Sequence, residues 1–383
     1  MAGGRPSHKT YWWYGGGSAS HRARPDAPRL VAKLGFRTLV VNAGSSSLKL
    51  SLLDEQADNP IAERELAAPG ARIDPGELMD ALRTGGLGAA DAVGHRIVHG
   101  GERFREAVRV DPDVRQALEE LTALAPLHQP SSLAALDAVS RELPGIPAVA
   151  CFDTAFHSTM PEAATTYALP AEWRRRWGLR RFGFHGLSHS YIARRVPELL
   201  GVPPGELRIV SCHLGAGASL CAIAAGRSVE TTMGFTPLEG LVMATRSGSV
   251  DPGLLLWLLE ETSMSEAEMA AALEHDSGLK GLADSADMRE VLAARAGGDR
   301  RATVAIDVYL HRLRAAIAAM AAALGGVDAL AFTGGVGEHA QEIRDAAVAG
   351  LGFLGAAPQV LVVPAREDLE IARQVETLLQ NSP

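Results

Sequence analysis

A strand, a turn of small residues and a second strand follow one another twice along this chain, about 170 residues apart. The first copy spans residues 38–53 and turns at Asn-Ala-Gly-Ser-Ser-Ser, and the second spans 209–223 and turns at Gly-Ala-Gly-Ala-Ser. A third turn of small residues, 333–337, follows the apolar run 329–332, and we expect a helix to begin near Glu338. The chain therefore repeats one structural unit.

Turns of this kind suit phosphate binding, because Gly, Ser and Ala let backbone N–H groups approach an anion closely. Either hairpin alone also fits an ordinary sheet. The sequence has neither a GxxxxGK[ST] loop nor a GxGxxG turn after a first strand. Residues 302–324 have the apolar spacing of a mostly buried helix. Together these patterns indicate an α/β protein with duplicated domains that face each other across a nucleotide cleft.

Composition narrows the class of protein. The 383 residues are 47% hydrophobic and 21% charged, which is enough for a substantial core and suggests two or three domains. A net charge of -8 gives no basic field for nucleic acid or an anionic membrane, so neither is expected as a partner. The apolar stretch 315–332 is interrupted short of a membrane span. Three cysteines without framework spacing favour a reducing compartment, and we predict a cytoplasmic location.

The first 35 residues differ from the rest of the chain. They contain a Gly-Gly-Gly run, scattered Arg, Ser and Pro, and no apolar periodicity. They also lack the apolar core of a secretory signal. We interpret residues 1–35 as a disordered extension.

Ten short motifs give the chain a resemblance to a known family. They are VNAGSSSLK (41–49), GHRIVHGGE (94–102), LAPLH (124–128), FDTAFH (152–157), RFGFHG (181–186), MGFTPLEG (233–240), TRSG (245–248), GVGE (335–338), VVP (362–364) and EDL (367–369). The order of these motifs is that of the acetate kinase family, which the chain therefore resembles. This family belongs to the superfamily of sugar kinases, actin and heat-shock ATPases.

The resemblance implies a fold and an activity. The fold would be two actin-like, ribonuclease H-like domains, one at 36–153 with the C-terminal helix 368–383 returning to it, the other at 154–367. The activity would be reversible phosphoryl transfer between ATP and acetate, giving acetyl phosphate and ADP. The family also implies a homodimer.

The resemblance assigns site residues by position. The catalytic residues would be Asp153, His185 and Arg246, and the substrate-binding residues Arg96, Val98, Leu127, Phe184 and Pro237. A short fatty acid is already a carboxylate at pH 7, since carboxyl pKa values lie near about 4, so no general base is required. We therefore expect Asp153 to orient an arginine or the metal shell.

Metal and nucleotide positions follow in the same way. Mg²⁺, with Mn²⁺ as an alternative, would be held by Asn42 and Glu367, because this ion needs only one or two protein oxygens. The nucleotide-binding residues, for ATP or ADP, would be Lys49, His213, Leu214, Gly215, Ala216, Gly217, Asp287, Met288, Arg289, Gly335, Val336, Gly337, Glu338 and His339. His128 also matches a family histidine.

Some positions depart from the family pattern. Ala216 stands where the family has Asn, Ser249 where it has Asp, and His339 where it has Asn, and the connections 54–93 and 354–359 are short. A propionate or butyrate kinase, which would have a larger acyl pocket, stays open as an alternative with the same chemistry. The changed nucleotide turns leave a pyrophosphate-dependent acetate kinase open as well. A non-catalytic nucleotide-binding regulator is a third, which the intact Arg96 and Arg246 argue against.

Overall fold

The computed structural model describes residues 35–44, 47–55, 58–68, 73–126, 129–354 and 357–380. The predicted extension 1–35 falls outside these ranges except for its last residue, and so do Leu127 and His128. None of the helices in the described part of the chain is long and apolar enough to cross a membrane.

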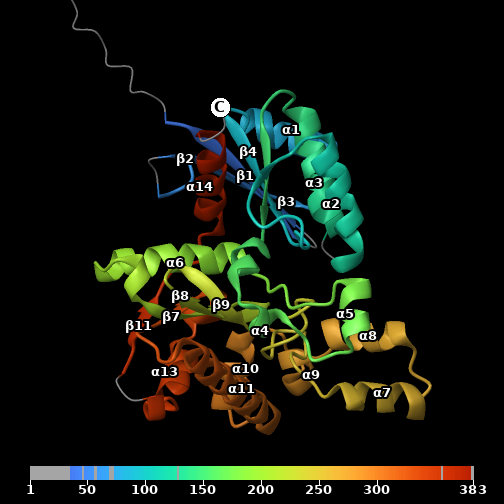
Figure 1. Cartoon of the computed structure of the whole chain (residues 1–383), viewed down its shortest axis with the longest axis vertical. Helices are drawn as coiled ribbons and strands as arrows, with labels where there is room; N and C mark the ends of the chain where they lie inside the picture. The colour runs from blue at the N-terminus through green and yellow to red at the C-terminus, as the bar shows by residue number, and fades with distance from the viewer. Residues whose placement is uncertain are drawn as a thin grey trace, which may run out of the picture. The chain divides into compact units, whose positions relative to one another are not determined.

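The strands of the described residues form two sheets with the same core topology (Figure 1). The first has the order β3 (Ala62–Ala67), β2 (Ser47–Asp54), β1 (Arg37–Ala43), β4 (Ala92–Ile97), β6 (Ala148–Phe152), β5 (Val108–Arg109). The second has the order β9 (Arg227–Thr231), β8 (Ala218–Ala224), β7 (Arg208–Leu214), β10 (Ala329–Thr333), β11 (Gln359–Val362).

Both sheets pair their strands in the same way. In the first, β1 is antiparallel to β2 and parallel to β4, and in the second, β7 is antiparallel to β8 and parallel to β10. The two predicted hairpins are thus β1–β2 and β7–β8. This repeated arrangement is the duplication that the sequence pattern indicated, and the α/β fold class is confirmed. The boundary between residues 153 and 154 stays a prediction.

Helices and short 3₁₀ segments connect the strands. They are α1 (Pro75–Thr84), α2 (Pro112–Glu120), η2 (Leu121–Leu124), α3 (Gln129–Glu142), η3 (Ala155–Thr159), α4 (Glu162–Thr165), α5 (Ala171–Trp177), α6 (Gly186–Leu200), η4 (Pro204–Glu206), α7 (Pro252–Glu261), α8 (Glu266–His275), α9 (Gly278–Ala283), α10 (Met288–Ala296), α11 (Arg300–Leu324), α12 (Gly334–His339), α13 (Gln341–Ala349), η5 (Gly352–Leu354) and α14 (Glu367–Gln380).

The first sheet has a helix on each face. Leu39 and Val41 of β1 pack in one apolar cluster with α3, whereas Val40 packs on the other face with α14. Successive strand residues point to opposite faces, so this alternation buries both sides of β1. Gly94 of β4 lets α14 lie close, because a Cβ there would come within 2.5 Å of a methyl group of Ile371. The C-terminal helix is thereby fixed to this sheet.

The second sheet is covered in the same manner by α11 and α6. Asp299 caps α11 by accepting a hydrogen bond from the Ala302 N–H at 2.8 Å, and the helix ends at Gly325 in the left-handed region. The apolar face of α11 packs on Val210 and Cys212 of β7, in the main apolar core. Helix α6 packs on the opposite face, with Ile209.

One predicted helix begins earlier than expected. Instead of starting near Glu338, α12 begins at Gly334, whose φ is 78° and whose N–H donates to the Glu338 carboxylate at 3.0 Å. That carboxylate also accepts from the Ala365 N–H at 2.9 Å. Glu338 therefore fixes the start of its own helix through backbone groups that lie far apart in the sequence.

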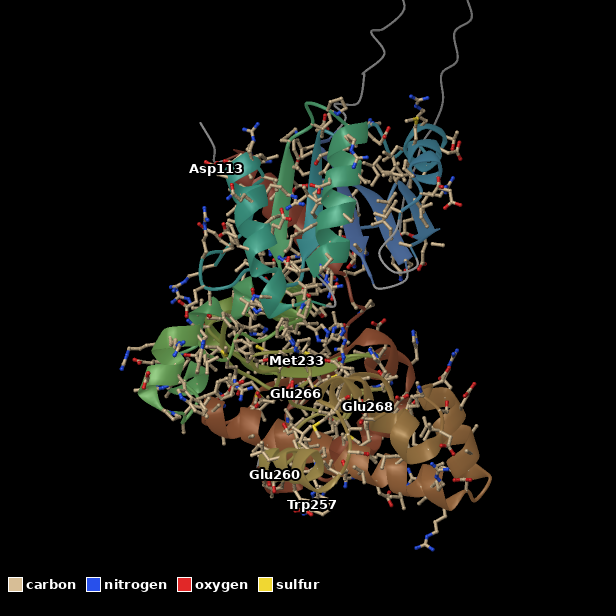
Figure 2. All side chains as sticks on the ribbon, turned by 90° about the vertical axis from the view of Figure 1, so that its right-hand side faces the viewer. Asp113, Met233, Trp257, Glu260, Glu266 and Glu268 are labelled. Carbon is tan, nitrogen blue, oxygen red and sulfur yellow. The ribbon has the colours of Figure 1, made fainter. Side chains whose placement is uncertain are left out.

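None of the residues of helix α7 is buried. Its sequence is apolar, yet Leu256 is 61% exposed and Trp257 is 56% exposed. Trp257 and Glu260 lie at the lower rim of the view in Figure 2.

Candidate active site

Arg96 joins side chains from three neighbouring strands and the last helix. It lies near the carboxyl end of β4, which pairs with β1 on one side and with β6 on the other. Asn42 belongs to β1, and Asp153 directly follows β6. Arg96 Nη2 and Asp153 Oδ2 are 2.7 Å apart, Arg96 Nη1 donates to Asn42 Oδ1 at 3.1 Å, and Arg96 Nε lies 3.7 Å from Glu367 Oε2. The carboxyl ends of parallel strands share one edge of a sheet, and this brings the predicted residues together.

The charges in this group do not balance. One guanidinium, buried to four-fifths, faces two carboxylates, Asp153 and Glu367. Burial raises the pKa of the Asp153 carboxyl, an effect that Arg96 opposes and Glu367 reinforces. Burial also disfavours the charge on Arg96, yet Asp153 and Glu367 together raise the pKa of its guanidinium. The group therefore has one negative charge more than it can pair internally, and a cation would complete it.

Three side chains that can donate hydrogen bonds to an anion lie beside the turn between β7 and β8, residues 215–217. A Cβ placed on Gly217 would lie 3.4 Å from His185 Nε2 and 3.6 Å from Arg246 Nη1. A Cβ placed on Gly215 would lie 3.6 Å from His213 Nε2. The two glycines thus keep open a space that two imidazoles and a guanidinium border, which suits an anion of phosphate size.

The two histidines at this turn are neutral. Their ring centroids are 4.3 Å apart. Burial lowers the pKa of His213 to about 4, and the charge of Arg96 contributes. Burial also lowers the pKa of His185, with contributions from His213, Arg96 and Arg246. At pH 7 both rings can therefore donate a hydrogen bond without adding charge.

Arg246 is held by a residue that the sequence analysis did not select. Its Nε lies 3.0 Å from the Glu274 carboxylate of α8, and its Nη1 is 3.5 Å from the Pro237 carbonyl. A planar guanidinium fixed on one edge can present its remaining N–H groups to an oxyanion. A single acidic residue among the 45 of the chain carries no distinguishing pattern, so Glu274 could not be found from the sequence.

A cavity of about 850 Å³ opens beside the turn. This volume lies within the range of small-molecule sites, about 300–1,000 Å³. Nine of the predicted nucleotide residues line it, together with Arg246, Leu279 and Tyr309. The nine are Gly215, Ala216, Gly217, Asp287, Met288, Arg289, Gly335, Val336 and His339. The structure thus connects the cavity to the space between His185 and Arg246.

Other predicted residues lie elsewhere. Lys49 is exposed on β2 opposite Asn42 in the strand register, and it is not among the residues that line the cavity. Leu214 is fully buried in the core, Gly337 is buried within α12, and the Glu338 carboxylate is engaged with backbone N–H groups. Their nucleotide roles stay predictions.

The predicted acyl wall is only partly visible. Phe184 is buried in the main core and Val98 packs against that core, whereas Leu127 lies outside the described residues. Pro237 is half-buried and reaches Arg246 through its carbonyl oxygen.

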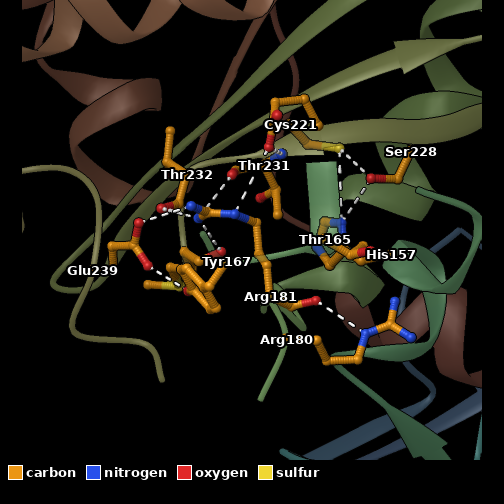
Figure 3. Close-up of polar contacts among 12 residues, drawn as sticks. His157, Thr165, Tyr167, Arg180, Arg181, Cys221, Ser228, Thr231, Thr232 and Glu239 are labelled. Carbon is orange, nitrogen blue, oxygen red and sulfur yellow. Dashed lines mark hydrogen bonds and ion pairs between the residues drawn. The ribbon is translucent and has the colours of Figure 1, made fainter. Parts of the chain in front are cut away.

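A hydrogen-bonded brace fixes the loop that carries Pro237 (Figure 3). Arg181 donates to the carbonyls of residues 231, 232 and 233 at 3.3, 3.2 and 3.1 Å, and to Glu239 at 2.8 Å. Tyr167 donates to Glu239 at 2.6 Å and accepts from the Phe235 N–H at 2.8 Å. Arg181 and Glu239 lie within motifs of the sequence, but no pattern indicated their roles or that of Tyr167.

No metal site with three or more His, Cys, Asp or Glu side chains is found among the described residues. The oxygens of Asn42, Asp153 and Glu367 around Arg96 are a sparser set. Mg²⁺ is bound through one or two carboxylates and several waters, so a sparse oxygen set fits this ion better than a soft metal.

Known proteins are similar to this chain along most of its length. Residues 79–370 match the model of the acetokinase family. The acetate kinase of Deinococcus radiodurans is 42% identical over 390 residues, which cover 89% of this chain and 98% of the relative.

Two crystal structures have the same fold over nearly their whole length. The acetate kinase of Porphyromonas gingivalis is 36% identical with a TM-score of 0.82, covering 90% of this chain and 100% of that one. A propionate kinase from Francisella tularensis is 31% identical with a TM-score of 0.83, covering 88% and 98%. The chain belongs to the acetokinase family.

Proposed function

We propose that this chain is an acetate kinase, which transfers the γ-phosphoryl group of ATP to acetate and yields acetyl phosphate and ADP, reversibly. The observation that carries the proposal is the space at Gly217, which His185 and Arg246 border at the mouth of a cavity large enough for a nucleoside. Phosphoryl transfer is catalysed chiefly by positioning and by charge neutralisation, and these residue types supply both.

Different residues contact the transferred phosphoryl group and the acetate. Arg246 and His185 stabilise the charge that spreads over the transferred phosphoryl oxygens, the arginine as a cation and the histidine as a neutral donor. Arg96 pairs with the acetate carboxylate. Asp153 holds Arg96 in place through its short contact of 2.7 Å. The attacking carboxylate is already ionised, so Asp153 takes no proton in this scheme.

Asn42 and Glu367 would hold a magnesium ion, with Mn²⁺ as the alternative. Their oxygens and the uncompensated negative charge of the group support this assignment. When bound, the ion neutralises charge on the phosphate oxygens. In this scheme Asn42 and Glu367 bind the ion directly, and Asp153 orients Arg96 beside it.

The cavity favours ATP over pyrophosphate as the phosphoryl donor. Pyrophosphate would occupy the turn at 215–217 and leave the remaining apolar wall, with Leu279 and Tyr309, without a ligand. An adenosine moiety would bury that wall. Ala216 and His339, which stand where the family has Asn, both line this cavity of about 850 Å³.

Propionate is the second candidate acceptor. The Francisella relative is named a propionate kinase and is as similar in fold as the acetate kinase from Porphyromonas. We assign acetate as the preferred acceptor, since the more similar Deinococcus relative at 42% identity is an acetate kinase. One additional methylene changes binding by only about 1–3 kcal/mol, so propionate should also react.

A second copy of this chain is the proposed partner. The exposed leucines and Trp257 of α7 form an apolar helix that a homodimer would cover. The cytoplasmic location stays a prediction. The three cysteines are free and buried, which is consistent with a reducing compartment.

One experiment tests the activity. The purified chain is incubated with Mg²⁺, ATP or pyrophosphate, and acetate, propionate or butyrate, and the acyl phosphate is trapped with hydroxylamine. The proposal predicts ATP-dependent acyl hydroxamate, with acetate giving the highest kcat/KM. Product with pyrophosphate alone would contradict the donor assignment, and no product with any pair would contradict the function.

A further inference from the structure

Buried serine and histidine side chains form a continuous path that ends at His185. His189, one turn further along α6, contacts Ser211 Oγ through Nδ1 and Ser219 Oγ through Nε2, both at 2.8 Å. Ser219 Oγ in turn lies 2.9 Å from His185 Nδ1. Ser211, Ser219 and His189 are all fully buried. The path therefore runs Ser211, His189, Ser219, His185, and its first three members are buried.

Only two arrangements of protons satisfy this path. Each hydroxyl has one proton to donate, and each neutral imidazole carries one N–H and one acceptor nitrogen. If Ser219 donates to His185 Nδ1, it must accept from His189 Nε2, and both histidines then carry their proton on Nε2. If Ser219 donates to His189 instead, both histidines carry it on Nδ1. The tautomers of the two rings are coupled.

The first serine of the path decides between the arrangements. Among the described residues, the Ser211 hydroxyl has a single hydrogen-bond partner, His189 Nδ1. With the proton on His189 Nδ1, Ser211 would have to accept, and its own buried O–H would be left without an acceptor. A buried donor without a partner is costly, whereas an unused lone pair costs less. Ser211 therefore donates its proton to His189 Nδ1. His189 Nε2 then donates to Ser219, and Ser219 donates to His185 Nδ1.

We propose that Ser211, His189 and Ser219 are positioning residues that hold His185 in the tautomer with its proton on Nε2. The inference rests on the proposed function for its catalytic meaning, since Nε2 is the atom that faces the turn at Gly217. There it can donate to a phosphoryl oxygen. The other tautomer would present a lone pair to that oxygen and repel it.

The ring also needs to be neutral and fixed in place. Burial lowers the pKa of both His185 and His189, so that neither ring takes a second proton near pH 7. His185 has a φ of 56° at the start of α6, an uncommon conformation for a residue with a side chain. The backbone conformation thus sets the position of the His185 ring, and the hydrogen-bonded path sets which ring nitrogen carries the proton.

Two neighbouring histidines provide internal references. His157 Nε2 lies 3.0 Å from the Phe184 carbonyl, which can only accept, so His157 must also carry its proton on Nε2. His213 Nδ1 pairs with Ser188 at 2.8 Å, off the path. Ser188→Ala thus removes a comparable serine–histidine contact from the same helix without interrupting the path.

The test is a measurement of imidazole nitrogen chemical shifts. The full chain is labelled with ¹⁵N-histidine, and the two-bond and three-bond proton–nitrogen correlations are recorded at pH 7 without substrates. His185 is assigned from its absence in a His185→Gln spectrum. Ser219→Ala is compared with Ser188→Ala, and kcat and KM are measured for both.

The wild-type chain should show His185 and His157 with pyrrole-like Nε2 and pyridine-like Nδ1. Ser219→Ala should move the two His185 nitrogen shifts toward each other and lower kcat with little change in the KM for acetate. Ser188→Ala should leave the His185 shifts unchanged. A wild-type His185 protonated on Nδ1, or a Ser219→Ala spectrum identical to wild type at His185, would overturn the proposal. The expected shifts in a chain without acyl phosphate activity would support the path and refute the proposed function.

Discussion

Replacing Gly217 by alanine should stop catalysis while the fold is kept. Gly217 does not have a left-handed backbone, and an added Cβ would meet its nearest atoms, in His185 and Arg246, at 3.4 to 3.6 Å. These are ordinary contact distances, so the methyl fits the unliganded protein. Gly→Ala at such a position even tends to stabilise a protein, by about 0.4–1 kcal/mol.

The same methyl occupies the space that the transferred phosphoryl group needs. It would separate that group from His185, from Arg246 or from both. Loss of one such donor costs about 10²–10³ in kcat, or about 2.7–4 kcal/mol. We therefore expect kcat for acetyl phosphate formation to fall by about this factor for Gly217→Ala.

The assay is hydroxamate formation at saturating ATP and acetate, together with thermal unfolding of each variant. Gly205→Ala is the matched control, because a Cβ there meets no atom within 4 Å. Gly183→Ala is the opposite control, because its φ is 76° and the added Cβ would lie 2.6 Å from Thr231 Cγ2. It should lower the Tm. A Gly217→Ala chain with the wild-type Tm and a kcat close to wild type would show that the phosphoryl group does not bind at Gly217.

Further substitutions probe the remaining parts of the site. Arg246→Ala should lower kcat by about 10²-fold or more at unchanged Tm, and an active variant would remove Arg246 from the chemistry. Glu367→Ala should raise the Mg²⁺ concentration needed for half-maximal rate more than the KM for acetate, whereas an unchanged Mg²⁺ titration would leave Glu367 as a helix-end acid. Val98→Ala should raise the ratio of kcat/KM for propionate to that for acetate, and an unchanged ratio would exclude Val98 from the acyl wall. Tyr167→Phe should lower the free energy of unfolding by about 1 kcal/mol, because Glu239 loses a partly buried hydrogen-bond donor, and unchanged denaturant unfolding would contradict the brace.

The parts of the fold that depend on local pattern were predictable. The hairpins β1–β2 and β7–β8 follow from β-branched and apolar runs broken by small turns, and α11 at Arg300–Leu324 follows from its helical spacing. The start of α12 was not predictable, because a Gly-rich run reads as a loop. It is set by the Glu338 carboxylate, which joins Gly334 to Ala365 across the fold.

The site residues also differ in whether a sequence motif or a tertiary contact defines them. Arg96, Asp153 and His185 were found because they lie in motifs of the sequence. The residues that hold Arg246 and His185 in place were missed, because Glu274 and Ser219 reach these side chains only through tertiary contacts. Ser219 bridges two histidines that lie far from it in the sequence, so no local sequence pattern indicates this contact.

The reverse reaction gives the most direct test of the central claim, since it starts from the proposed product. Acetyl phosphate, ADP and Mg²⁺ are mixed with the wild-type chain or with Arg246→Ala, and ATP is followed by luminescence. We expect ATP formation in proportion to the amount of wild-type enzyme, and a rate lower by about 10²-fold or more for the variant. No ATP from the wild-type chain, or equal rates from both proteins, would contradict this expectation.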